Sequence, residues 1–211
     1  MKVISTNISD PREMIINGEK RMTGIFKKAV NSIYLGTSDV RDDNVMNRKH
    51  HGGPEKACYV FSTDHYAFWK DKYPELEWEW GMFGENISIE GWDESKIKIG
   101  DVYNVGETQV EVSSPRIPCN FLSTKFKNEM MLGEYLHYNS PGTYLRVLKE
   151  GNISVGDEFK LVKSLEETQT VLEIYSLLRA KKNHELYDRA INNEALSEEY
   201  KKSVRKKYTI A

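Results

Sequence analysis

Cysteine and long apolar stretches are what this sequence has least of, and both shortages exclude classes of protein. Two cysteines in 211 residues are too few for the disulfide framework of a small secreted domain. No run of about 18 apolar residues occurs, so the sequence predicts no membrane-spanning helix. The first residues also lack a secretory apolar segment. We therefore expect a reduced, cytoplasmic protein with no membrane partner.

The chain also lacks a large excess of positive or negative charge. The formal net charge is -2, with 29% charged and 39% hydrophobic residues, which is ordinary for a globular protein. Such a chain has no global field that attracts nucleic acid. The basic residues 201–202 and 205–207 are explained more simply as cations at the end of a helix than as a nucleic-acid patch. We expect no nucleic-acid partner.

Glycine and proline are absent from the last quarter of the chain. All 14 glycines and 6 prolines precede residue 163, where they punctuate short segments of alternating or apolar residues. Gly-Asp turns at residues 100–101 and 156–157 resemble the corners of a closed sheet. The sequence therefore predicts a mainly β, barrel-like domain over residues 1–163. The expected strands cover residues 3–9, 23–30, 31–35, 57–61, 87–89, 108–112 and 144–148. Residues 97–103 and 155–159 resemble strands that break at the two Gly-Asp turns.

Helical spacing of apolar residues replaces this pattern after residue 163. It predicts three short helices, over residues 167–181, 183–192 and 197–208, which form an extension over residues 164–211. Their apolar stripes must be buried either on the barrel or against a second copy of the chain. We expect a homodimer.

The segment Ser113-Ser114-Pro115-Arg116-Ile117-Pro118-Cys119 is the most informative stretch of the chain. Its prolines fix two φ angles and remove two backbone donors, so the segment is predicted to be a stiff, non-helical arm. Arg116 is close enough in sequence to stabilise a thiolate on Cys119. A cysteine is otherwise a small buried hydrophobe, and this alternative is the better interpretation of Cys58, which lies inside an apolar strand.

Three further stretches carry candidate ligand-binding residues. Two glycines between His51 and Lys56 would let backbone amides approach an anion, although the same pattern suits an ordinary turn. Glu85 and Asn86 could bind a polar ring system or could simply form a turn. Arg146 lies in an apolar strand and needs either an ion pair or a bound phosphate. No spacing typical of a zinc site built from protein ligands occurs.

Taken in chain order, six segments resemble the MOSC family, named after the C-terminal domain of molybdenum cofactor sulfurase. The resemblance is to its small bacterial branch of the YiiM type, which ends in a three-helix extension. No single segment is specific, but the ordered set is. The segments are His51-Gly52-Gly53-Pro54-Glu55-Lys56-Ala57, Phe83-Gly84-Glu85-Asn86, Ile99-Gly100-Asp101, Pro115-Arg116-Ile117-Pro118-Cys119, Tyr144-Leu145-Arg146-Val147 and Gly156-Asp157.

The resemblance implies a β-rich domain similar to the pyruvate kinase β-barrel domain, and a molybdenum cofactor (molybdopterin). Cys119 matches the cysteine that ligates the metal. The cations that would bind the cofactor's phosphate and pterin are His51, Lys56, Arg116 and Arg146, with Glu85 and Asn86 at the pterin edge.

The implied activity is the reduction of N-hydroxylated compounds, such as hydroxylaminopurines and amidoximes, to amines. The resemblance also implies that a separate reductase supplies the electrons, and the sequence shows no ferredoxin-like cysteine set and no dinucleotide-binding glycine pattern that would identify the donor. Two other functions fit the residues. Cys119 could carry a persulfide in a sulfur-transfer protein, or the chain could be a binding module without enzymatic activity.

Overall fold

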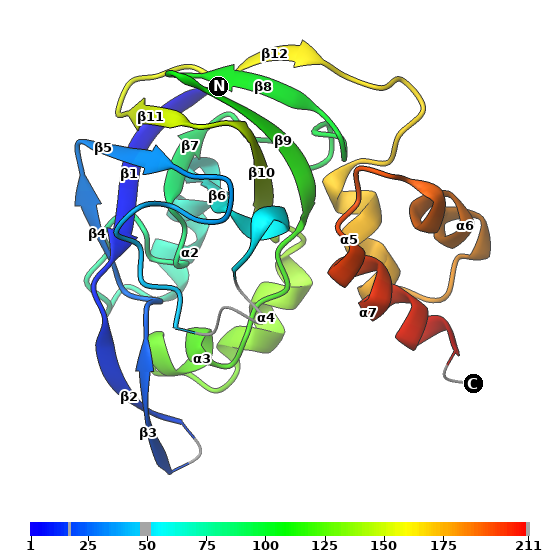
Figure 1. Cartoon of the computed structure of the whole chain (residues 1–211). Coiled ribbons are helices and arrows are strands. Elements are labelled where there is room, and N and C mark those ends of the chain that lie inside the picture. The colour runs from blue at the N-terminus through cyan, green and yellow to red at the C-terminus, as the bar shows by residue number, and fades with distance from the viewer. Residues whose placement is uncertain (17, 47–51, 210–211) are drawn as a thin grey trace.

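A curled sheet of eight strands forms most of the molecule, and three helices follow it (Figure 1). The computed structural model describes residues 1–16, 18–46 and 52–209. The predicted mainly β, barrel-like fold is confirmed. In spatial order the strands are β12 (Lys160–Lys163), β8 (Val102–Val105), β9 (Thr108–Pro115), β10 (Thr143–Lys149), β6 (Cys58–Ser62), β7 (Ile87–Glu90), β1 (Lys2–Ser9) and β4 (Lys27–Val30).

Two small antiparallel pairs complete the β structure. Strand β5 (Ser32–Leu35) pairs with β11 (Gly151–Ser154), and this pair packs beside β1 and β9 across the open side of the curled sheet (Figure 1). Its residues Ile33 and Ile153 are buried in the same core as the large sheet. The hairpin of β2 (Arg12–Ile16) and β3 (Glu19–Thr23) extends away from the barrel.

Strands β6 and β7 run parallel, whereas the other paired strands that the structure describes are antiparallel. A parallel pair requires a crossover connection, and residues 63–86 provide it. The crossover contains the 3-10 turn η2 (Thr63–His65) and helix α2 (Tyr66–Lys72). As a result, the residues that precede β6 and those that precede β7 meet at one edge of the sheet.

An aromatic cluster packs under this crossover. The rings of Phe61, Trp69, Phe83, Phe126 and Tyr135 are each at most 1% exposed. Neighbouring rings within the cluster lie 4.2–6.2 Å apart between centroids, the range in which aromatic pairs add stability beyond their buried area. Helices α3 (Phe121–Lys125) and α4 (Met131–Tyr138) cover the cluster.

The three predicted C-terminal helices are confirmed as α5 (Val171–Arg179), α6 (His184–Asn192) and α7 (Glu198–Thr209). Thr170 and Glu173 form a capping box at the start of α5, which satisfies two otherwise free backbone donors. Val171 and Val204 are fully buried in one core with the strands. The apolar stripes of the helices are therefore covered by the barrel, and the expected homodimer stays a prediction.

The predicted Gly-Asp turn at residues 156–157 is confirmed, because Gly156 takes a φ of 94° and its N–H donates to the carbonyl of Val3. Another segment differs from the sequence-based expectation. The expected strand over residues 23–30 is broken at residues 24–26. At Gly24 an added Cβ would lie 2.1 Å from the carbonyl oxygen of Asn44, so the chain bends there against a neighbouring segment.

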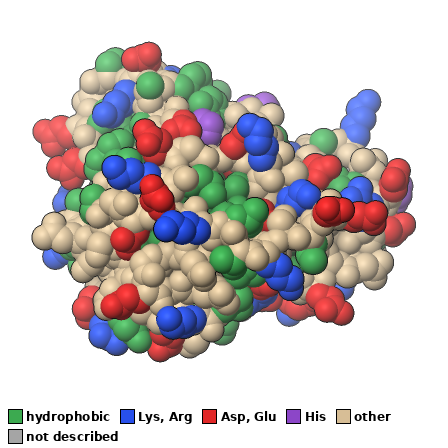
Figure 2. Space-filling view, turned by 90° about the horizontal axis from the view of Figure 1, so that it is seen from above, with side chains coloured by type: hydrophobic (Ala, Val, Ile, Leu, Met, Phe, Trp, Pro, Cys, Tyr) green, Lys and Arg blue, Asp and Glu red, His purple; other side chains and the backbone are tan. Residues whose placement is uncertain are grey.

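Charged side chains of both signs are mixed over the face shown in Figure 2, where no continuous patch of one sign is visible. This distribution matches the small net charge of the chain. Among the residues that the structure describes, no helix is both long enough and apolar enough to cross a membrane.

Candidate functional site

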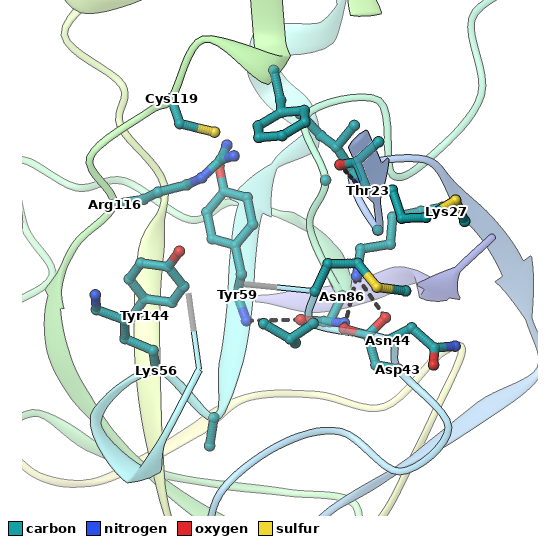
Figure 3. A pocket seen from close by; sticks show the side chains of 18 of the residues that line it. Thr23, Lys27, Asp43, Asn44, Lys56, Tyr59, Asn86, Arg116, Cys119 and Tyr144 are labelled. Carbon is teal, nitrogen blue, oxygen red and sulfur yellow. Dashed lines mark hydrogen bonds and ion pairs between the residues drawn. The ribbon is translucent and has the colours of Figure 1, made fainter. Parts of the chain in front are cut away.

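A cavity of about 290 Å³ opens beside Cys119, at the edge of the sheet where β6 and β7 begin (Figure 3). The side chains that line it come from segments far apart in the sequence, and the β2–β3 hairpin contributes one wall. The lining residues that matter for its chemistry are Lys27, Asp43, Lys56, Asn86, Arg116 and Cys119.

Cys119 ends a four-residue arm, residues 116–119, that leaves β9 without helical or strand structure. The predicted segment 113–119 is non-helical as expected, although its first three residues belong to β9; its stiffness stays a prediction. The carbonyl of Cys119 accepts the N–H of Leu122 and starts α3, so the thiol is fixed between a strand and a helix. Cys119 is partly exposed, whereas Cys58 is fully buried. Burial raises the pKa of the Cys58 thiol, which confirms its interpretation as a core residue.

Arg116 places a buried cation next to this thiol (Figure 3). The residue is 5% exposed, and its Nη1 donates to the carbonyl of Phe83 at 2.7 Å and to the hydroxyl of Tyr59 at 3.3 Å. Burial raises the pKa of Tyr59, so that phenol stays neutral. No carboxylate among the described residues forms an ion pair with Arg116. A buried guanidinium held only by neutral dipoles favours an anionic ligand.

On the opposite side of the cavity, Lys27 and Asp43 form a buried ion pair (Figure 3). The Lys27 Nζ lies 2.7 Å from one Asp43 oxygen, and the two side chains are only 6% and 3% exposed. Burial lowers the pKa of Lys27 although Asp43 opposes this shift. Asp43 therefore neutralises Lys27, whereas no carboxylate in the part of the chain that the structure describes neutralises Arg116.

Asn86 lines the cavity, but its amide is also used to hold the cavity wall. Its Oδ1 accepts the N–H of Tyr59 at 3.1 Å, and its Nδ2 donates to Asp43 at 2.8 Å. These two bonds join β6, β7 and the loop after β5. The side chain thus fixes the relative position of three segments, whatever it contributes to a ligand.

Glu85 is buried behind the cavity and does not line it. Its carboxylate accepts from the Tyr66 hydroxyl at 2.5 Å, from the N–H groups of Gly81 and Phe83 at 2.9 and 3.1 Å, and from the Ser88 hydroxyl at 2.7 Å. Four donors leave little capacity for a ligand. The arrangement therefore supports the turn before β7.

Arg146 does not line the cavity, and of the two expected partners, an acidic side chain or a phosphate, it has acidic side chains. Its Nη1 is bonded to Glu111, and its Nη2 lies 3.8 Å from Glu55. Lys56 does line the cavity, and its Nζ donates to Glu199 of α7 at 2.7 Å. The structure thus brings together Lys56, Asn86, Arg116 and Cys119 of the predicted site. His51 lies outside the described residues.

Several site residues were missed by sequence reasoning. Tyr59 lies in a segment interpreted only as a strand, and Tyr144 lies in a segment from which only Arg146 was a candidate; both tyrosines line the cavity. Lys27 and Asp43 give no local signal, because their pairing depends on how the loop after β5 returns to β4. Glu199 of α7 could not be expected either, since nothing in the sequence shows where the extension docks.

No group of three or more histidine, cysteine or acidic residues that could hold a metal occurs in the part of the chain that the structure describes. Cys119 can offer one soft thiolate.

Comparison with known proteins agrees with these features. The MOSC domain family model matches residues 47–160. YflK of Bacillus subtilis is 33% identical over 207 residues, which cover 97% of this chain and 93% of YflK. A protein named reductase from Gibberella moniliformis is 34% identical over 134 residues, or 62% of this chain and 24% of that protein. The crystal structure of YiiM from Geobacillus stearothermophilus superimposes with a TM-score of 0.80 at 25% identity, over 97% of each chain.

Proposed function

Since the chain belongs to the MOSC domain family, we propose that it is a molybdenum cofactor-dependent oxidoreductase that reduces N-hydroxylated compounds to amines. Hydroxylaminopurines and amidoximes are the proposed substrate classes. The name reductase of the Gibberella moniliformis relative supports a reductive activity. The similarity to YiiM over the whole chain supports a site built around the same arm and extension.

The residues around the cavity fit a cofactor that has both a soft metal and an anionic arm. Cys119 presents a partly exposed thiol, the ligand type that soft metals prefer. Arg116 offers a buried positive charge without a carboxylate partner in the described residues, and a guanidinium matches phosphate in geometry and charge. The observation that carries the proposal is that one arm holds both groups at one cavity.

Each residue of the chain then has a distinct task. Cys119 would ligate the metal, and Arg116 and Lys56 would bind the anionic arm of the cofactor. Tyr59 fixes the guanidinium of Arg116 through its ring and hydroxyl. Asn86 holds the wall opposite the arm. When bound, the cofactor would supply the chemistry of removing an oxygen atom and exchanging two electrons.

The overall reaction balances with an external electron donor. The N–O bond of the substrate breaks, the oxygen leaves as water, and the nitrogen ends as an amine or, for an amidoxime, as the nitrogen of an amidine. Two protons come from solvent and two electrons from a separate reductase. That reductase is a proposed partner, because the sequence has no second redox centre of its own.

Metal analysis and activity of the same preparations test this proposal. Protein purified from a host that makes the cofactor should contain about one molybdenum per chain, and it should release a fluorescent pterin on denaturation. It should also reduce a hydroxylaminopurine when a reductase system is supplied. Cys119→Ala should lose both the metal and the activity. Full activity in that variant would refute the assignment of Cys119.

A sulfur-transfer function is the second candidate, because Cys119 is accessible and a persulfide needs an accessible thiolate. It predicts a mass increase of one sulfur atom on Cys119 and no molybdenum. Intact-protein mass spectrometry and metal analysis of one sample separate the two functions. A binding module without activity predicts neither signal.

A further inference from the structure

A second cavity, of about 320 Å³, lies on the other side of the arm, between the arm and α7. We call it the α7 cleft. It shares Lys56, Cys119, Phe121 and Tyr144 with the first cavity, and α7 contributes Glu199 and Ser203. Cys119 therefore borders two chambers of similar size. Such an arrangement lets a cofactor in one chamber and a substrate in the other meet at one reactive centre.

The wall that α7 forms is firmly attached to the barrel. Glu55 accepts the backbone N–H of Glu198 at 2.9 Å and the hydroxyl of Ser197 at 3.1 Å, so its carboxylate caps the start of α7. The N–H of Ser197 also donates to the carbonyl of Ser113, two residues before the end of β9. Helix α7 is thus joined to the barrel through both Glu55 and Ser113, and the cleft exists before any ligand binds.

Much of the lining of the α7 cleft is apolar or aromatic. Tyr144, Phe121, Pro118 and Ile117 supply this surface, which suits a planar ring. The Nζ of Lys56, which also lines the cleft, lies 2.7 Å from Glu199 Oε2. This pair is neutral as a whole and the other described lining residues are uncharged, so the described part of the cleft offers no net charge to attract a phosphate. Glu199 is 42% exposed and can accept a further N–H on its carboxylate.

We propose that the α7 cleft is the substrate chamber and that Glu199 sets its specificity. The chamber takes flat, uncharged N-hydroxylated heteroaromatic compounds or aryl amidoximes, whose N–H groups donate to the Glu199 carboxylate. This inference rests on the proposed function, since it assigns the first cavity to the cofactor. The extension of three helices then completes the site rather than only covering the barrel.

Glu199 selects against negative charge for a simple electrostatic reason. A substrate that carries a carboxylate would bring a second anion beside Glu199 in a partly enclosed space. Lys56 can compensate only one of the two. We therefore expect benzamidoxime to be reduced in preference to 4-carboxybenzamidoxime, and we expect Glu199→Gln to narrow the ratio of their kcat/KM values about tenfold.

A blocking variant tests the location of the chamber. Ser203 lines the cleft and is partly buried, so Ser203→Trp should fill it. The full-length variant should keep the molybdenum content of the wild type while kcat/KM for benzamidoxime falls at least about 100-fold. Hydroxylamine, which is far smaller, should still be reduced. Lys202→Trp and Glu198→Gln are the matched controls, because both residues are on α7 and neither lines the cleft.

The possible results separate this inference from the proposed function. Undiminished reduction of benzamidoxime by Ser203→Trp overturns the chamber while the oxidoreductase stands. Loss of molybdenum in Ser203→Trp also overturns it, because the cleft would then belong to the cofactor site. If the wild type holds no molybdenum, the proposed function fails. The substrate chamber is then tested by calorimetric titration with benzamidoxime alone. Binding to the wild type but not to Ser203→Trp supports the chamber, and no binding to the wild type overturns it.

Discussion

The guanidinium carbon of Arg116 lies 4.5 Å from the ring centroid of Tyr59, and the Arg116 Nη1 lies 3.3 Å from the Tyr59 hydroxyl. This pair holds a positive charge in a buried position without neutralising it, since burial raises the pKa of Tyr59 and keeps the phenol protonated. A buried charge that is kept at a functional site without being neutralised is expected to lower the free energy of unfolding.

Arg116→Met tests that expectation. Removing a buried charge without a carboxylate partner among the described residues should leave the free energy of unfolding of ligand-free protein unchanged or raise it by about 1 kcal/mol. Binding of inorganic pyrophosphate, measured by calorimetry, should weaken about 10- to 100-fold. Arg146→Met is the matched control, because it breaks an ion pair with Glu111 far from the cavity. The control should lose stability and keep pyrophosphate binding.

The two cysteines should differ in reactivity. Cys119 is partly exposed, whereas Cys58 is buried and burial raises the pKa of its thiol. Iodoacetamide should therefore alkylate Cys119 in the native protein and reach Cys58 only after unfolding. Peptide mass spectrometry before and after adding guanidinium chloride gives the result. Modification of Cys58 at the same rate as Cys119 in native protein would contradict the placement of both residues.

The ion pair between Lys27 and Asp43 should be strongly coupled. Asp43→Asn leaves Lys27 buried without its anion, which should lower the free energy of unfolding by about 3–5 kcal/mol. Adding Lys27→Met to that variant should recover part of the loss, because the unpaired charge is then gone. Urea unfolding of the two single variants and the double variant measures the coupling. Additive effects would mean that the two side chains do not interact.

Lys125 should make stability depend on pH. Burial lowers the pKa of Lys125 to about 7, with Glu85 opposing the shift and Lys27, Arg116 and Arg12 adding to it. Between pH 7 and the ordinary lysine value, the unfolded chain then binds more protons than the folded chain, so stability rises with pH. The wild type should gain about 1 kcal/mol per pH unit relative to Lys125→Met from pH 7.5 to 9.5.

Urea unfolding at three pH values in that interval checks this slope. Lys27 also has a lowered pKa, but it is present in both proteins and its effect cancels in the difference. A difference between the two proteins that stays constant with pH would show that Lys125 titrates at its ordinary value.

Glu85→Gln distinguishes a structural role from a role in cofactor binding. The amide would turn an NH₂ group toward one of the donors that Glu85 now accepts, and we expect a loss of about 2–4 kcal/mol in unfolding free energy. Molybdenum per folded chain should stay near the wild-type value. A stable variant that cannot hold molybdenum would instead place Glu85 in contact with the cofactor.

Sequence patterns predicted the elements whose periodicity or proline content is visible within a single segment. The alternation around residues 108–112 predicted β9, and the apolar spacing after residue 163 predicted all three final helices. The two prolines beside Arg116 predicted a non-helical arm. In each case the pattern is visible within one segment, although β9 is held by its pairing with β8 and β10 and the helices by burial in the common core.

The site residues that were missed depend on distant contacts. The sequence alone allows either an acidic side chain or a phosphate as the partner of Arg146. Only the pairing of β9 with β10 brings Glu111 opposite it. Glu199 reaches Lys56 across 143 positions of the sequence. No periodicity encodes such a meeting, because it follows from how the extension folds back on the barrel.

Because β6 and β7 are parallel, the connection between them is long, and part of it can change in length. Both strands start at the rim of the cavity, and residues 63–86 join them. The last part of this connection belongs to the site, because Gly84 and Asn86 line the cavity and the carbonyl of Phe83 accepts from Arg116. Insertions or deletions at residues 73–80, before that part, change the aromatic packing but leave the two strand starts in register. Lineages that descend from such a protein can therefore remodel the outer shell of the molecule without disturbing the chemistry at its centre.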